Sequence, residues 1–164
     1  MQKLTKKHVL PYVQYGAKML SKATALGEKD RIWTLEPSHF QNNWNCEFDG
    51  KIILRPFSDL FKKINFNGEE IKPIYWIFDN DYKSKVHRYE VKEGYYGTYI
   101  NIHIYPENSA YLVNQLELTD GHKIEHDSID YQTMCNLISL QFDVFGLIHE
   151  DFAVDINMLH LYNT

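Results

Sequence analysis

The segment TYINIHIYP, residues 98–106, alternates isoleucine with aromatic and polar residues. A repeat of two residues matches a β-strand, whose successive side chains point to opposite faces of a sheet, and does not fit an amphipathic helix, whose period is about 3.6 residues. One face of this strand is predicted to lie in the core through Ile100, Ile102 and Ile104. The other face is predicted to be at least partly exposed, with a row made of Tyr99, Asn101, His103 and Tyr105.

The neighbouring segments extend this strand into a sheet. VHRYEVKEG before it and AYLVNQLELT after it are predicted to be strands, and the following TDGH turn folds the chain back. RIWTLEPSHFQNNWNCEF is typical of two strands and a turn, and IKPIYWIF is typical of a buried strand. The sequence therefore predicts an antiparallel meander of about four to six strands.

Helices are predicted in three places. A short N-terminal helix is expected from a Thr5 cap to Tyr15, ended by Gly16. A short middle helix is expected over residues 56–64, where apolar residues recur at helical spacing. A long C-terminal helix is expected from Asp127 or Ser128 to Gly146, packed on one face of the sheet.

The chain as a whole is predicted to be one α+β domain over residues 1–164. Its 164 residues suffice to bury a sizeable core, and an aromatic content of 15% argues against disorder. No repeat, low-complexity tract or Pro/Gly/Ser-rich linker divides it.

Charge, cysteine content and hydropathy together indicate the class of protein and its cellular location. The formal net charge of −5 argues against a non-specific nucleic-acid binder, which normally carries a basic surface. Cys46 and Cys135 stand far apart with no metal-ligand spacing, as expected of reduced thiols in a cytoplasm. The N-terminus lacks the apolar region of a signal peptide, and no apolar run approaches the ~18 residues that a membrane span needs. We therefore expect a soluble cytoplasmic protein that does not enter a membrane.

Three stretches together resemble a protein family: LTKKHVLPYVQYG at 4–16, ILRPFSDL at 53–60 and LISLQFDVFGLIHEDFAVDIN at 137–157. They are similar to the Pro-Tyr-x-x-Tyr-Gly, Leu-Arg-Pro-x-Ser-Asp-Leu and Phe-Asp-x-Phe-Gly-Leu-Ile motifs of a family of small uncharacterised proteins from phages and prophages of Bacteroides-like bacteria. The resemblance covers about a quarter of the chain. Gln14 departs from it where a second proline is common, and Glu150-Asp151 departs where a glycine is often found.

No activity or catalytic residue is established for that family, so none is transferred to this chain. The resemblance implies a phage or mobile-element context. Small non-enzymatic proteins that bind a host component are frequent in that context.

HKIEH, residues 122–126, matches the His-x-x-Glu-His zinc pattern, which requires a helix to bring both histidines to one ion. Here the pattern follows an Asp-Gly turn and is predicted to be a returning strand. His122 and His126 would then lie ~13 Å apart, too far to chelate one metal. We therefore expect no metal and no cofactor.

A metal-dependent nuclease or hydrolase is the alternative function. Asp79 or Asp81 at a strand end, followed by Glu90 and Lys92 on the next strand, resembles the Asp…Glu-x-Lys arrangement in which carboxylates hold Mg²⁺ and a lysine steadies the attacking water. In a chain with 22 acidic residues, acid-x-Lys matches also arise by chance. The pattern is therefore weak.

Other catalytic patterns have even less support. Neither cysteine has a histidine and amide partner nearby in the sequence, and no nucleophile elbow or glycine-rich phosphate loop occurs. His149, Glu150 and Asp151 are interpreted as the solvated tip of a turn, with a site as the alternative.

These observations favour a non-catalytic protein that binds a host protein, such as a counter-defence or host-takeover factor. The predicted binding surface is the row of Tyr99, Asn101, His103 and Tyr105, because aromatic and amide side chains on a rigid sheet suit recognition. The alternative is that another element covers this row.

Overall fold

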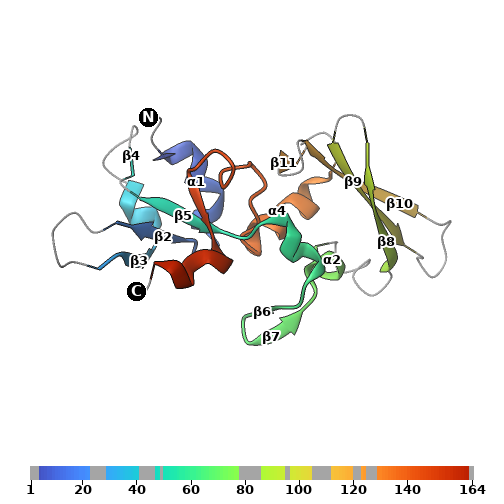
Figure 1. Cartoon of the computed structure of the whole chain (residues 1–164), viewed down its shortest axis with the longest axis horizontal. Coiled ribbons are helices and arrows are strands. Elements are labelled where there is room, and N and C mark those ends of the chain that lie inside the picture. Colours follow the sequence, from blue (N-terminus) through green and yellow to red (C-terminus); the bar gives the residue numbers. More distant parts are fainter. Residues whose placement is uncertain are drawn as a thin grey trace. The chain divides into compact units, whose positions relative to one another are not determined.

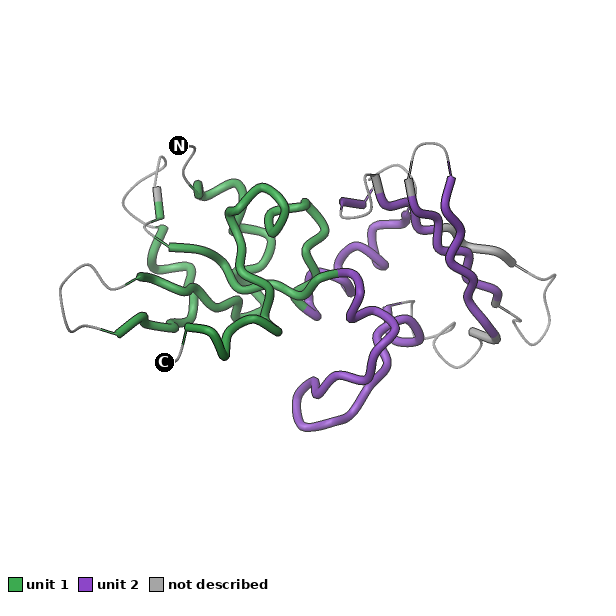
Figure 2. The backbone as a smooth tube through the Cα atoms, in the orientation of Figure 1, with its two compact units in different colours: residues 1–56, 141–164 green, residues 57–140 purple. Residues whose placement is uncertain are grey.

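A computed structural model of the chain describes residues 4–22, 29–40, 47–48, 50–77, 86–94, 97–104, 112–119, 123–124 and 129–162. The chain divides into two compact units (Figure 2). Unit 1 combines residues 1–56 with residues 141–164, and unit 2 is the intervening segment, residues 57–140. The single-domain prediction is not confirmed by this division, and it stays a prediction.

The architecture is mixed α/β, with short helices and several sheets, most of them antiparallel (Figure 1). Within the described ranges there are two four-stranded and two two-stranded sheets. None of the helices in these ranges is long and apolar enough to cross a membrane.

Unit 1 begins with strand β1 (Leu4–Thr5) and helix α1 (Lys6–Val13). Thr5 is the N-cap, and its backbone N–H donates to Nδ1 of His8 at 3.0 Å. Gly16, at φ +67°, takes the left-handed conformation that often follows a helix end. The predicted N-terminal helix is confirmed.

The four-stranded sheet of unit 1 has the order β12-β5-β2-β3. Strands β2 (Lys18–Ser21), β3 (Arg31–Thr34) and β5 (Lys51–Leu54) pair antiparallel, whereas β12 (Ala153–Asp155) pairs parallel with β5. On one face, Leu20, Ile53 and Val154 form a buried cluster against which the 3₁₀-helix η4 (Ile156–Leu161) packs. Two smaller elements complete the described part of unit 1, namely η1 (Pro37–Phe40) and β4 (Glu47–Phe48), which pairs with β1.

Hydrogen bonds hold the two sequence segments of unit 1, residues 1–56 and 141–164, together. The Oη of Tyr12 donates to the carbonyl of Phe142 at 3.0 Å, and the backbone N–H of Val144 donates back to that Oη at 3.3 Å. Arg55 pairs with the same segment through its backbone, at 2.8 Å to the carbonyl of Gln141 and 2.9 Å from the N–H of Asp143. Tyr12, Arg55 and residues 141–144, which are far apart in the sequence, therefore meet within unit 1.

The predicted meander is confirmed in unit 2. Strands β8 (Val86–Glu93), β9 (Gly97–Ile104), β10 (Leu112–Thr119) and β11 (Lys123–Ile124) pair antiparallel in chain order. Unit 2 also holds η2 (Phe57–Phe61), the hairpin of β6 (Ile64–Phe66) and β7 (Glu69–Ile71), and the helices α2 (Pro73–Trp76) and α4 (Tyr131–Ser139).

The long C-terminal helix is not found. Helix α4 starts after Asp130, whose carboxylate caps the helix by accepting the Thr133 N–H at 2.9 Å, and it ends at Ser139. Gln141 then takes φ +63°, and the following residues leave the helix to pair with Arg55. Tertiary hydrogen bonding overrides the helical periodicity of residues 142–145, and the predicted stop at Gly146, φ +75°, is a turn instead.

Two other predicted elements differ in kind. Residues 57–61 form a 3₁₀-helix rather than an α-helix, and Ile64, predicted on its buried face, starts strand β6 instead. Pro73 begins the one-turn helix α2 where a strand was predicted. Proline favours this first helical position because no helical hydrogen bond is lost there.

Candidate functional site

The predicted row on β9 is partly accessible. Tyr99 and Asn101 are half-buried, as predicted, but His103 is only 7% exposed and the prediction of its exposure is wrong. Tyr105 lies outside the described residues. β9 is a central strand between β8 and β10, so longer cross-strand side chains flank a short imidazole on it. One of these is Glu90, whose Oε1 lies 3.7 Å from Nε2 of His103.

The opposite side of β9 confirms the alternation. Ile100 is 1% exposed and Ile102 is 0% exposed, whereas the Ile104 side chain lies outside the description. On β10, Leu116 and Leu118 are buried as well. A sheet with one apolar face in the core leaves the Tyr99 face to solvent or to a partner.

A charged row on β8 flanks Tyr99 and Asn101. Glu90 is the register partner of Asn101, and Lys92 is the register partner of Tyr99. The Glu90 carboxylate accepts from Nζ of Lys92 at 3.2 Å and lies 3.4 Å from a guanidinium nitrogen of Arg88. We call the described side chains on this side of the sheet the polar face: Arg88, Glu90, Lys92, Tyr99, Asn101, His103 and Glu117.

The hydrogen bond from Lys92 lowers the pKa of Glu90, and the charges of Lys92, Arg88 and His103 act in the same direction, while desolvation opposes them. A carboxylate held ionised by neighbouring cations is a weak general base, since the best catalytic pKa lies near the operating pH. It is well suited to fix the positions of those cations. The polar face therefore presents an ordered charge pattern beside an aromatic ring and an amide.

Sequence reasoning found Tyr99 and Asn101 but missed the contribution of Arg88 and Glu117. The signal was present, because RYEVK at residues 88–92 places alternate charged residues on one side of a strand. Glu117, half-buried, is the register partner of Tyr99 on β10. Only the pairing register shows that these charges border the β9 row.

The nuclease pattern is described only in part. Glu90 and Lys92 share one face of β8 and bond to each other, and Asp79 and Asp81 lie outside the described residues. His122, His126 and Cys46 also lie outside them, so the zinc pattern is not described either. In the ranges that are described, no three His, Cys, Asp or Glu residues are placed to hold a metal ion.

The His149-Glu150-Asp151 tip is an exposed turn. Asp151, at φ +65°, donates its backbone N–H to the carbonyl of Ile148 at 3.2 Å, and its carboxylate pairs with Nζ of Lys51. These contacts follow from the turn and its neighbouring strand. The turn interpretation is therefore the one that the geometry favours.

The buried carboxylate of this region is Asp143, 3% exposed. Its two oxygens accept the N–H groups of Leu147 and Ile148, each at 2.7 Å. Desolvation raises the pKa of Asp143, and these backbone hydrogen bonds oppose the rise. Sequence reasoning missed Asp143, whose role here is to hold the turn.

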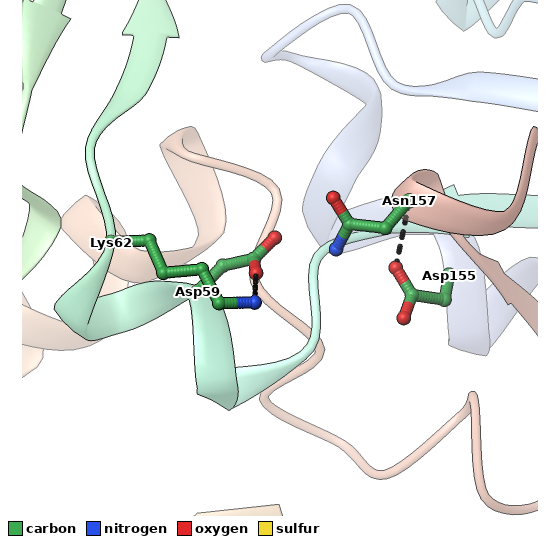
Figure 3. A network of polar contacts seen from close by, with 4 residues as sticks. All are labelled: Asp59, Lys62, Asp155 and Asn157. Atoms are coloured by element: carbon green, nitrogen blue, oxygen red, sulfur yellow. Dashed lines mark hydrogen bonds and ion pairs between the residues drawn. The ribbon is translucent and has the colours of Figure 1, made fainter.

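Two further side-chain contacts are local (Figure 3). In unit 2, Nζ of Lys62, the residue after η2, donates to the buried carboxylate of Asp59 in η2 at 2.7 Å. In unit 1, the carboxylate of Asp155 accepts the N–H of Asn157 at 2.8 Å and caps η4. Each contact explains a polar residue by the element that it stabilises.

No protein-family model, curated protein or solved structure matches the chain.

Proposed function

We propose that this chain is a small, non-catalytic protein of a phage or other mobile element that binds a host protein in the host cytoplasm. A counter-defence or host-takeover role would follow if binding occludes the host protein. The observation that carries the proposal is the polar face, where half-buried Tyr99 and Asn101 lie beside an ordered row of charges.

Each part of the polar face has a chemical role in this proposal. Tyr99 supplies an anchor, because an aromatic ring adds contact area at a low cost in conformational entropy. Asn101 offers both hydrogen-bond donors and acceptors. Arg88 and Lys92, with side chains 59% and 61% exposed, supply charges that select a partner of complementary potential.

Rigidity supports the proposal as well. β9 pairs with β8 and β10 along its length, and its other face is buried, so the polar face is held by the core. A surface that is ordered before binding loses less conformational entropy on binding.

The decisive experiment compares variants in affinity capture from host lysate. Tyr99→Ala, on the polar face, is compared with Val91→Ala, on the opposite face of the same sheet and 49% exposed. A partner retained by Val91→Ala and lost with Tyr99→Ala would support the proposal. A partner retained equally by both variants would move binding to another surface.

The same preparations separate the alternative function. If the unmodified chain cleaves plasmid or single-stranded DNA with Mg²⁺, and Glu90→Gln abolishes cleavage, the chain is a nuclease and the binding proposal fails.

A further inference from the structure

Strand β3 forms an edge of the unit 1 sheet. In the order β12-β5-β2-β3 it pairs with β2 on one side, and no strand in the described part of the chain pairs with its other side (Figure 1). An exposed edge strand presents backbone N–H and C=O groups that can bind a further strand.

The pairing register identifies which backbone groups face the open side. In an antiparallel pair, hydrogen-bonded and non-hydrogen-bonded residue pairs alternate. The bond from the Leu35 N–H to the Ala17 carbonyl, 2.8 Å, makes that pair hydrogen-bonded, and Trp33 two residues earlier is equally bonded to β2. Ile32 and Thr34 fall in the alternate pairs, so their N–H and C=O groups point toward the open edge.

An apolar side chain accompanies these groups. Ile32 is 41% exposed and lies across from buried Leu20, on the face of the sheet that η4 covers. η4 itself exposes a row of two apolar residues, Met158 at 45% and Leu161 at 55%, because 3₁₀ spacing places them away from the packed side of the helix. The exposed Ile32 therefore leaves apolar surface beside the open edge for an added segment to cover.

The charge around β3 is positive, although the chain carries a net charge of −5. Four exposed cationic side chains lie on or beside β2 and β3: Lys18, Lys22, Lys29 and Arg31. They form no salt bridge with another described residue. Three acidic residues of the same stretch, Glu28, Asp30 and Glu36, offset three of these four positive charges, so residues 17–36 carry a formal net charge of +1. A segment that docks here is favoured if it carries carboxylates.

We infer that β3 is a docking strand for an extended acidic segment of a partner protein. The segment adds to the sheet beside β3 and bonds to the backbone of Ile32 and Thr34. Its apolar side chains cover Ile32, and its carboxylates lie near Lys29 and Arg31. This inference is independent of the polar face, which belongs to unit 2 and uses side chains rather than a strand edge.

The first test uses the whole chain and two labelled peptides, EVEVEVE and KVKVKVK. Fluorescence anisotropy should show that the acidic peptide binds at least roughly tenfold more tightly than the basic one, and that its affinity falls as salt screens the charges. No binding of EVEVEVE, or equal binding of both peptides, would overturn the inference.

The second test blocks the edge. Thr34→Pro removes an N–H that points away from β2, and proline is tolerated at such edge positions. The control, Thr34→Val, keeps the N–H. We expect Thr34→Pro to weaken EVEVEVE binding by roughly five- to tenfold through the lost hydrogen bond and the added ring, with Thr34→Val close to the unmodified chain. Equal affinities for the two variants would contradict strand addition.

A third measurement needs no variant and decides the question if Thr34→Pro fails to fold. Amide hydrogen exchange of the unmodified chain should slow at Ile32 and Thr34 when EVEVEVE is added. Unchanged exchange at both amides in the presence of bound peptide would overturn the inference. A dimer of the chain that Thr34→Pro dissociates would also overturn it, because a second copy would then occupy the edge.

Discussion

Removing one buried oxygen should loosen the place where the two sequence segments of unit 1 join. Tyr12 is 0% exposed, and its Oη contacts the carbonyl of Phe142 at 3.0 Å and the N–H of Val144 at 3.3 Å. Tyr12→Phe keeps the ring, which meets Phe145 edge-on at 6.0 Å between centroids, and removes only the hydroxyl. The change therefore isolates the hydrogen bonds from the packing.

The expected loss follows from these two contacts. A hydrogen bond contributes about 0.5–1.5 kcal/mol net, and a buried polar group left without its partner costs about 1–3 kcal/mol. The N–H of Val144 retains a contact to the Phe142 carbonyl at 2.9 Å, which reduces the penalty. We expect Tyr12→Phe to lower the free energy of unfolding by about 2 kcal/mol, equivalent to a fall in Tm of roughly 4–8 °C for a chain of this length.

Urea denaturation followed by circular dichroism measures this loss, with Tyr131→Phe as the control. Tyr131 is 83% exposed, so its hydroxyl removal should change the free energy of unfolding by less than about 0.5 kcal/mol. Amide exchange at Val144 should also accelerate in Tyr12→Phe. If both variants unfold at the same urea concentration, the hydroxyl of Tyr12 does not hold the join, and the reasoning is refuted.

Three further outcomes are expected. Burial, and to a smaller extent the charge of Lys7, lowers the pKa of His8 from its ordinary value of 6.5. The stability that neutral His8 contributes is therefore present above pH 6.5 and is lost as the pH falls through the lower pKa of the folded state. In a series of urea denaturations at different pH, His8→Gln should remove this fall in the urea midpoint. Ile102→Ala should cost about 2–5 kcal/mol by urea denaturation, whereas Tyr99→Ala should leave Tm within a few degrees, and equal losses would make the Tyr99 side of β9 structural. Plasmid incubated with Mn²⁺ should stay intact, and Glu90→Gln should leave that result unchanged; nicking by the unmodified chain that the variant lacks would contradict it.

Local patterns predicted the elements whose determinants lie close together in the sequence. The alternation around Ile100 and Ile102 predicted β9 and its buried face. Thr5 predicted the start of α1, whose end at Val13 falls two residues before the predicted Tyr15. Period and capping are properties of a few neighbouring residues, so no distant contact is needed to predict them.

The elements that were mispredicted depend on distant partners. Residues 140–146 look helical, yet they pair with Arg55 and hydrogen-bond to Tyr12, which lies 130 positions before Phe142. The parallel pairing of β12 with β5 likewise joins segments about a hundred residues apart, and no local pattern predicts it. Tertiary contacts of this kind routinely override helical preference.

The sequence predicted the two central residues of the polar face, Tyr99 and Asn101, but not the charged residues that border them. The period of two placed Tyr99 and Asn101 on one face, but it could not predict the burial of His103, which depends on the side chains across from it. The contribution of Arg88 likewise depends on the register between β8 and β9. Register is a pairing property that one strand's sequence does not specify.

The division of unit 1 between both ends of the sequence has a consequence for synthesis on the ribosome. Residues 57–140 emerge as one continuous stretch and can begin to fold as soon as they leave the exit tunnel. β5 gains its parallel neighbour only after residues 153–155 have been made. The sheet of β2, β3 and β5 therefore remains incomplete until β12 is translated, about a hundred codons after β5. During that interval the nascent sheet exposes a second open edge. A chaperone that covers strand edges would then raise the yield of native protein, and a slow stretch of codons between residues 57 and 140 would lower it.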